Sequence, residues 1–213
     1  MTYYSFRRSK LDELLFRHQY LMKGDIIDIG GKKEKKRGSF KPPLSQVKSW
    51  KYVNIDKSTN PDFCCSAENI PVEDSSFDTV LLCEIIEHLE TPEKVLTEAY
   101  RLLKRGGTLI VSVPFLFPIH ADPFDYQRWT NTRIRSVIKS AGFSDIKMAT
   151  MGGIGAVIHD LLLVTFNKTQ NIYLKSLGFL GLRLIRPIFS IIDKIFMEAE
   201  EAITTGYFVV AKK

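Results

Sequence analysis

The sequence predicts an α/β fold in which helices cover both faces of a mostly parallel β-sheet. Segments typical of strands alternate along the chain with segments that have the apolar spacing of amphipathic helices. Several of the strand-like segments are apolar at successive positions, which is typical of strands buried on both faces of a parallel sheet. With 213 residues, of which 45% are hydrophobic, the chain can bury such a sheet within one domain spanning residues 1–213.

Seven segments are predicted to be strands. In chain order they are residues 25–31, 52–56, 63–67, 77–83, 108–113, 143–149 and 207–211, of which the third has the weakest pattern. A helix is expected to begin at Pro92, where the missing N–H of proline costs nothing, and to end at Gly106 and Gly107.

Two further helical segments flank the core. Residues 5–23 form an amphipathic pattern, and residues 155–201 are helical up to the last strand. The domain therefore divides into an N-terminal helix (1–23), a core (24–150), a helical cap or insertion (151–203) and a final strand (204–213). We expect residues 172–196 to form a cap over the functional site, with a dimer face or a shallow contact with an anionic membrane left open.

Charge and cysteine content narrow the class of protein. The net charge is +6, and most of it lies in residues 32–41, so binding of nucleic acid along a basic face is not expected. This basic segment is either a solvated loop or an element that recognises an anionic substrate. Three cysteines, with Cys64 and Cys65 adjacent, form neither a disulfide framework nor a zinc-ligand spacing, so we expect reduced thiols and no metal site.

The chain has no apolar segment of the length that a membrane span requires and no apolar core of a signal peptide near its start. The sequence therefore predicts a cytoplasmic protein, and peripheral contact with a membrane is left open by the apolar segment near the C-terminus.

Chemistry-bearing residues follow the predicted strands at their carboxyl ends, where parallel α/β sheets bind ligands. Asp28 is followed by Gly30 and Gly31, which let a ligand approach the backbone closely. The second strand ends at Asp56, whose carboxylate can accept hydrogen bonds from both hydroxyls of a ribose. The next two strands are followed by Ala67 and Glu68, and by Cys83, Glu84 and His88.

These segments together resemble the class I S-adenosylmethionine-dependent methyltransferases over residues 24–150. Asp28, Gly30 and Gly31 stand at the family's glycine motif and Asp56 at its ribose-binding acid. The resemblance implies a Rossmann-like, doubly wound, seven-stranded sheet with an antiparallel last strand, and S-adenosylmethionine as cofactor. It implies cofactor contacts for Asp28, Gly30, Gly31, Asp56, Ala67, Glu68, Cys83, Glu84 and His88.

Two departures from the family pattern stand out. The third glycine is replaced by the basic segment, and the interval from Gly31 to Asp56 is stretched. A dinucleotide is disfavoured, because its pyrophosphate needs glycine at three fixed steps over a helix N-terminus. Both His88 and Glu84 also have a structural alternative to cofactor binding. His88 could cap a helix, and Glu84 could place a favourable negative charge at a helix N-terminus.

Residues 114–130 are dense in proline, aromatic and ionisable side chains, which is typical of a functional loop. This loop resembles the acceptor-side loop of methyltransferases in surface-polysaccharide and sugar-modification pathways. His120 is the candidate general base, because imidazole titrates near neutral pH, and Asp122 is a second base or orients His120. Tyr126 and Arg128 are the candidate acceptor-binding residues. The structural alternative is an ion pair between Arg128 and Asp125.

The leading hypothesis is methyl transfer from S-adenosylmethionine to a small acceptor, namely the hydroxyl or amine of a sugar or carrier-linked saccharide. A non-catalytic relative that binds the cofactor or a protein partner is the second hypothesis, supported by the incomplete glycine motif and the apolar C-terminal part. RNA methylation directed by the basic segment ranks third, and a homodimer is left open.

Overall fold

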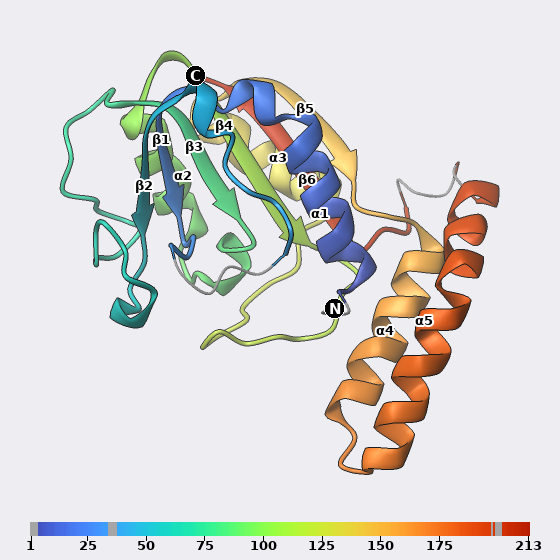
Figure 1. Cartoon of the computed structure of the whole chain (residues 1–213). Helices are drawn as coiled ribbons and strands as arrows, with labels where there is room; N and C mark the ends of the chain where they lie inside the picture. The colour runs from blue at the N-terminus through green and yellow to red at the C-terminus, as the bar shows by residue number, and fades with distance from the viewer. Residues whose placement is uncertain (1–3, 34–37, 197, 199–201) are drawn as a thin grey trace.

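The computed structural model describes residues 4–33, 38–196, 198 and 202–213. Its sheet has six strands in the order β2-β1-β3-β4-β6-β5 (Figure 1). Their bounds are Gly24–Ile29 for β1, Val47–Val53 for β2, Phe77–Cys83 for β3, Leu103–Pro114 for β4, Ser144–Thr150 for β5 and Gly206–Lys212 for β6. Strands β1 to β4 pair in parallel, whereas β6 is antiparallel to both β4 and β5. The α/β class and the antiparallel last strand are confirmed.

The sheet has one strand fewer, among the described residues, than the seven predicted. The segment 63–67 makes only an isolated parallel bridge between Phe63 and Val53. Phe63 donates its N–H to Tyr52 O at 3.0 Å and accepts from Asn54 N at 3.1 Å, and the exposed Cys64 follows directly. This short run has too little apolar surface to be buried on both faces, so the pairing does not extend.

The described residues form five α-helices: α1 (Phe6–Arg17), α2 (Pro92–Leu102), α3 (Asn131–Ser140), α4 (Ile154–Lys168) and α5 (Ile172–Ile195). Short 3-10 turns cover Gln19–Leu21, Leu44–Gln46, Lys57–Thr59 and Ile86–His88. Helix α2 begins at Pro92 as predicted but ends at Leu102, earlier than expected. Leu103 is fully buried and pairs with Phe77 as the first residue of β4, so Gly106 and Gly107 lie within β4.

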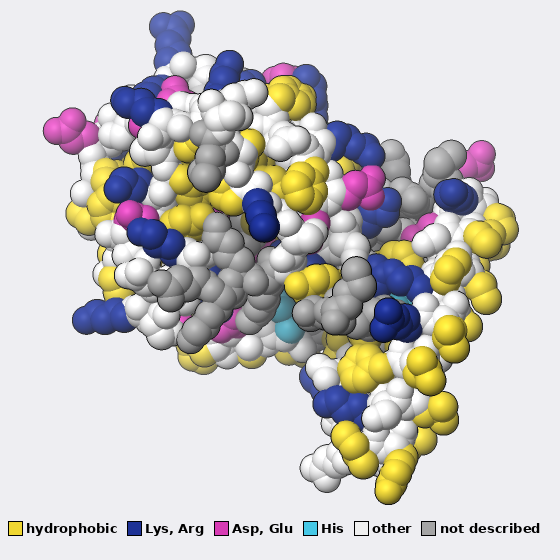
Figure 2. Space-filling view, viewed as in Figure 1, with side chains coloured by type: hydrophobic (Ala, Val, Ile, Leu, Met, Phe, Trp, Pro, Cys, Tyr) yellow, Lys and Arg dark blue, Asp and Glu magenta, His cyan; other side chains and the backbone are white. Residues whose placement is uncertain are grey.

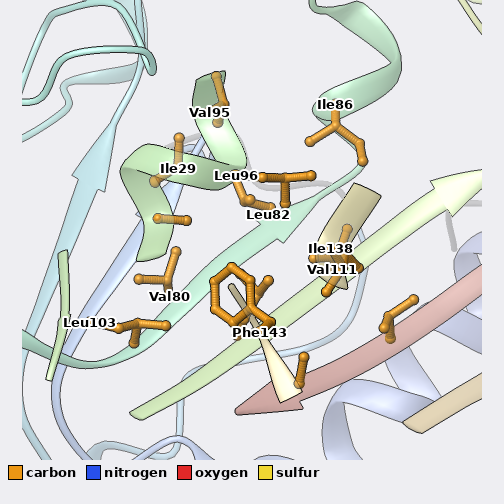
Figure 3. Close-up of a cluster of buried hydrophobic side chains, with 14 of the residues drawn as sticks. Ile29, Val80, Leu82, Ile86, Val95, Leu96, Leu103, Val111, Ile138 and Phe143 are labelled. Carbon is orange, nitrogen blue, oxygen red and sulfur yellow. The ribbon is translucent and has the colours of Figure 1, made fainter. Parts of the chain in front are cut away.

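Two hydrophobic layers pack against the sheet, one on each face. The larger layer packs β1, β3 and β4 against α2 and α3, with Val80 and Leu82 of β3 pointing into it (Figure 3). Leu81, between them in sequence, packs on the other face beneath α1, next to Leu11 and Leu15. Successive residues of β3 are thus buried on opposite faces, which explains its continuous apolar pattern.

Helices α4 and α5 form a hairpin that projects away from the sheet (Figure 1). Its base is tied to the N-terminal helix: Asp160 accepts from the N–H groups of Phe6 and Arg7 at 2.7 and 3.0 Å, and Arg186 donates to Tyr4 O at 2.7 Å. Figure 2 shows apolar side chains gathered along the hairpin. On α5 the exposed large ones are Ile172, Tyr173, Leu174, Leu177, Leu180, Leu184, Ile185, Ile188, Ile191 and Ile195. None of the described helices is long and apolar enough to span a membrane.

Candidate functional site

A cavity of about 410 Å³ opens at the carboxyl ends of β1, β2 and β3. It lies where parallel α/β sheets bind ligands, and its volume is typical of a small-molecule site. The structure brings nine of the residues predicted from the sequence together in its wall: Asp28, Gly30, Gly31, Asp56, Cys83, Glu84, His88, His120 and Asp122.

The glycine turn after β1 is held so that no side chain fits beside it. Gly30 has a φ of +80°, and a Cβ added to it would lie 2.7 Å from the side chain of Ile85. A Cβ on Gly31 would lie 2.3 Å from the carboxyl group of Asp28. Asn54, which was not predicted from the sequence, donates from Nδ2 to the carbonyl oxygens of Gly30 and Gly31 at 3.2 and 3.1 Å and ties the turn to the end of β2.

Asp56 lies beyond the end of β2 and caps the turn after it. Its Oδ1 accepts from the N–H of Ser58 at 2.9 Å, and its Oδ2 accepts from Ser58 Oγ at 3.0 Å. Carboxylate oxygens accept more than one hydrogen bond each, so this cap is compatible with the ribose contact expected for Asp56.

The N-terminal helix forms a wall of the cavity that sequence reasoning did not predict. Buried Arg7 of α1 forms an ion pair with Glu84, and its guanidinium lies 4.0 Å from the ring centre of Phe117. Burial lowers the pKa of Arg7 to about 10, an effect that the negative charge of Glu87 opposes. Arginines on an amphipathic helix give no sequence signal of where they point, which is why Arg7 was missed.

Cys83 lines the cavity at the end of β3 without being a reactive thiol. Burial raises its pKa to about 12, so the thiol stays protonated at neutral pH and is a weak nucleophile. All three cysteines are free, in agreement with the expectation of reduced thiols.

Three ionisable side chains converge at the rim of the cavity. His88 Nε2 and His120 Nε2 each lie 3.7 Å from Oε1 of Glu87, which is fully buried. One ligand atom from each of the three side chains lies within 4.8 Å of the others. The sequence predicted no metal site because the three cysteines show no zinc-ligand spacing. No spacing rule brings His120, which lies in the loop 114–130, close to Glu87.

Ala67 and Glu68 do not line the cavity. Ala67 packs against the larger core layer. Glu68 accepts from the hydroxyl of Thr91 and lies 3.4 Å from Lys94 Nζ, on the surface near the start of α2. Their displacement results from the missing strand, whose end would have aimed them at the cavity.

Tyr126 and Arg128 also lie outside the cavity wall. Tyr126 donates its N–H to Glu87 O at 2.9 Å and has an exposed ring. Arg128 forms the ion pair with Asp125 that the sequence left open, and it donates to the carbonyl oxygen of Pro118 at 3.2 Å. The guanidinium lowers the pKa of Asp125 to about 2. Arg128 thus holds the loop 114–130 in shape, and acceptor binding by Tyr126 and Arg128 stays a prediction.

A second cavity, of about 540 Å³, adjoins the first and shares Arg7, Arg8 and His120 with it. The loop 117–121 and the end of α4, including Lys168, complete its wall. Three of its described lining side chains are Lys or Arg, and none is acidic. The described residues of α5 line neither cavity, so the segment 172–196, expected as a cap, does not cover the site in this structure.

The basic segment 32–41 touches the site at one end. Lys32 lines the first cavity, and its Nζ lies 3.8 Å from Asp122 Oδ2. Lys33 lies 3.6 Å from Asp62. Residues 34–37, which carry much of the expected charge, lie outside the described residues.

Comparisons with known proteins agree with this geometry. A family model described as a methyltransferase domain matches residues 45–111. An uncharacterized protein of Methanocaldococcus jannaschii is 31% identical over 144 residues, covering 67% of this chain and 58% of that protein. A ubiquinone/menaquinone biosynthesis C-methyltransferase of Rhizobium etli is 29% identical over 124 residues, covering 44% of this chain and 48% of its own. The chain therefore spans about half the length of these relatives.

Among solved structures, a SAM-dependent methyltransferase of Thermotoga maritima superposes with a TM-score of 0.52 and 25% identity, covering 67% of this chain and 75% of that one.

Proposed function

Because the chain belongs to the class I S-adenosylmethionine-dependent methyltransferases, we propose that it transfers the methyl group of this cofactor to a small-molecule acceptor. In this reaction a lone pair of the acceptor forms a bond to the methyl carbon. The bond between carbon and sulfur breaks, its electrons stay on sulfur, and S-adenosylhomocysteine leaves. The protein contributes mainly by holding the acceptor in line and within ~3–3.5 Å of the methyl group.

The observation that carries the proposal is the cavity at the ends of β1 to β3, whose residues fit the cofactor. Gly30 and Gly31 line the cavity with backbone that carries no side chain, so a ligand can approach this turn closely. Asp56 lies where ribose hydroxyls can donate to a carboxylate, and Trp50 and Ile55 supply apolar surface beside it. Asp28, Cys83, Glu84 and His88 complete the proposed contacts.

The adjoining cavity supports an acceptor that carries negative charge. Arg8 and Lys168 add positive charge to its wall, next to Arg7, which is paired with Glu84, and arginine suits a phosphate or carboxylate particularly well. A sugar phosphate or a saccharide linked to a carrier through phosphate combines this charge with hydroxyls that can be methylated. His120 lies in both cavities, so we assign acceptor activation to His120, with Asp122 beside it.

Two measurements test the function in sequence. Titration calorimetry with S-adenosylhomocysteine should show binding, and a folded sample without any heat of binding would overturn the proposal. Release of S-adenosylhomocysteine is then measured with phosphorylated sugars and with the same sugars lacking phosphate. We expect turnover with the phosphorylated set only. Cofactor binding without transfer to any acceptor would favour the non-catalytic relative. Homodimer formation and contact with a membrane stay predictions.

A further inference from the structure

We propose that Glu87, His88 and His120 bind a divalent transition-metal ion at the rim of the first cavity. The metal-binding part stands on the geometry of these side chains alone. Its consequence for the acceptor rests on the proposed function.

The distances are close to those of a coordination sphere. Each histidine Nε2 lies 3.7 Å from Oε1 of Glu87. Ligand atoms around an ion such as Zn²⁺, each bonded at ~2.0–2.2 Å, are separated by about 3.4 Å. Small side-chain rotations would therefore bring the three atoms into bonding distance. Two histidines and one carboxylate are also a donor set that binds zinc or iron(II) in proteins.

Nδ1 of each histidine, the ring nitrogen that does not face Glu87, already contacts a backbone carbonyl oxygen. His88 Nδ1 lies 2.6 Å from Phe124 O, and His120 Nδ1 lies 3.2 Å from Pro118 O. A carbonyl oxygen only accepts, so each Nδ1 carries the proton. In the neutral ring Nε2 then holds the lone pair, and it faces Glu87. Metal-binding histidines are oriented by the same kind of outer hydrogen bond.

The environment of the Glu87 carboxylate favours binding of a cation. Its side chain is fully buried, and neither oxygen has a hydrogen-bond partner among the described residues. A buried carboxylate without such partners is costly. The charges of Arg7 and Glu87 act on each other, but Arg7 is paired with Glu84 and Arg128 with Asp125. A bound metal ion would satisfy the carboxylate directly.

The open side of the cluster faces the ligand. His88 and His120 both line the first cavity, and His120 also lines the second. Three protein ligands with the remaining positions open to a cavity are typical of catalytic metal sites, whereas structural sites are closed by a fourth side chain. Water or an acceptor oxygen would complete the coordination.

This position assigns the metal a part in the proposed reaction. A coordinated hydroxyl loses its proton more readily, so the acceptor oxygen would release its proton to water and attack the methyl carbon of the cofactor. The sulfur would take the electrons of the broken bond. His120 would then activate the acceptor as a metal ligand and not as a free base, and the methylated atom would be oxygen rather than nitrogen.

Cobalt(II) titration of the chelator-stripped protein tests the binding directly, because its visible absorption changes when histidine and carboxylate replace water. We expect saturation at one ion per chain. Glu87→Gln and His120→Ala should each weaken cobalt affinity by at least ~10-fold, since even the outer partners of metal ligands contribute 10–100-fold. His18→Gln is the matched control: its ring lies outside both cavities and contacts Leu14 O, so binding should not change.

Calorimetry with S-adenosylhomocysteine on the same samples separates the two proposals. Cofactor binding without saturable cobalt binding would overturn the metal site and leave the proposed function standing, whereas loss of both would overturn both. Cobalt affinity unchanged in folded Glu87→Gln and His120→Ala proteins would also overturn the site. His120 is on a partly exposed loop, so His120→Ala keeps the test available if Glu87→Gln does not fold. Activity restored to stripped enzyme by zinc or manganese would support the role in the reaction.

Discussion

Arg7 of α1 forms a buried ion pair with Glu84, the residue directly after β3, so the first helix of the chain closes the site formed by the strand ends. Both side chains are less than a tenth exposed. Ser112 donates to the other oxygen of Glu84 at 2.9 Å, which fixes the carboxylate from β4. The position of α1 over the cavity thus depends on a charge pair between segments far apart in the sequence.

Removing one member of this pair should cost more than removing both. Arg7→Met or Glu84→Gln alone would leave a buried charge without its partner, at about 3–5 kcal/mol in the free energy of unfolding. The double variant should cost clearly less than the sum of the two single variants, as urea unfolding in a double-mutant cycle would show. Additive losses would mean that the two charges are independently solvated.

Asp56 should matter more for cofactor binding than for folding. Asp56→Ala removes a carboxylate whose hydrogen bonds with ribose hydroxyls are worth about 1.5–3 kcal/mol, or roughly 10–100-fold in the dissociation constant of S-adenosylhomocysteine. Asp56→Asn keeps an oxygen that can cap Ser58 and should weaken binding less. His120→Ala should leave cofactor affinity within a factor of about two. Equal losses for Asp56→Ala and His120→Ala in calorimetry would contradict this division of roles.

The residues at the strand ends of the site could be predicted from the sequence, because the apolar pattern of a buried strand indicates where the strand ends. Asp28 and Cys83 lie within the last two residues of β1 and β3, as the apolar runs predict. The second strand was predicted to end at Asp56, but β2 ends at Val53 and Asp56 caps the turn that follows. All three residues line the cavity. Ala67 and Glu68 do not line the cavity, because the segment before them forms only an isolated bridge, and a single paired residue does not fix the direction of the chain after it.

The contacts between distant segments could not be predicted from the sequence. Arg7 reaches Glu84 only because α1 packs on one face of the sheet through Leu11 and Leu15. His120 lies near Glu87 only because the loop 114–130 folds back toward it, in a conformation held by the ion pair between Arg128 and Asp125. Both depend on the packing of whole elements, which hydrophobic periodicity does not encode.

Glu98 should make stability depend on pH in the acid range. Burial opposes ionisation, but hydrogen bonds from Arg101 and from the N–H of Ile70 hold the pKa of Glu98 below its ordinary value of 4.5. Because the folded pKa is depressed, the stabilisation is fully present above about pH 5 and is lost as pH falls through the folded pKa.

Glu98→Gln should therefore cost about 1.5–3 kcal/mol at pH 7, and the difference from the unmodified chain should shrink as the pH falls below the ordinary glutamate pKa of 4.5. Urea unfolding at several pH values measures it. The exposed Glu93, which pairs with Arg133 on the surface, gives the control Glu93→Gln, expected to stay within about 1 kcal/mol throughout. A cost for Glu98→Gln that does not vary with pH would contradict the charge-based explanation.

Two glycines of α5 should respond in opposite ways to the same substitution. A Cβ on Gly178 would lie 2.4 Å from the ring of Phe166 on α4, whereas nothing lies within 4 Å of a Cβ on Gly181. Gly181→Ala should stabilise the hairpin by about 0.5–1 kcal/mol through helix propensity. Gly178→Ala should destabilise it, because overpacking costs about 1–3 kcal/mol and outweighs that gain. Amide hydrogen exchange in α5 measures both effects locally, and equal protection in the two variants would show that α4 and α5 do not pack through Gly178.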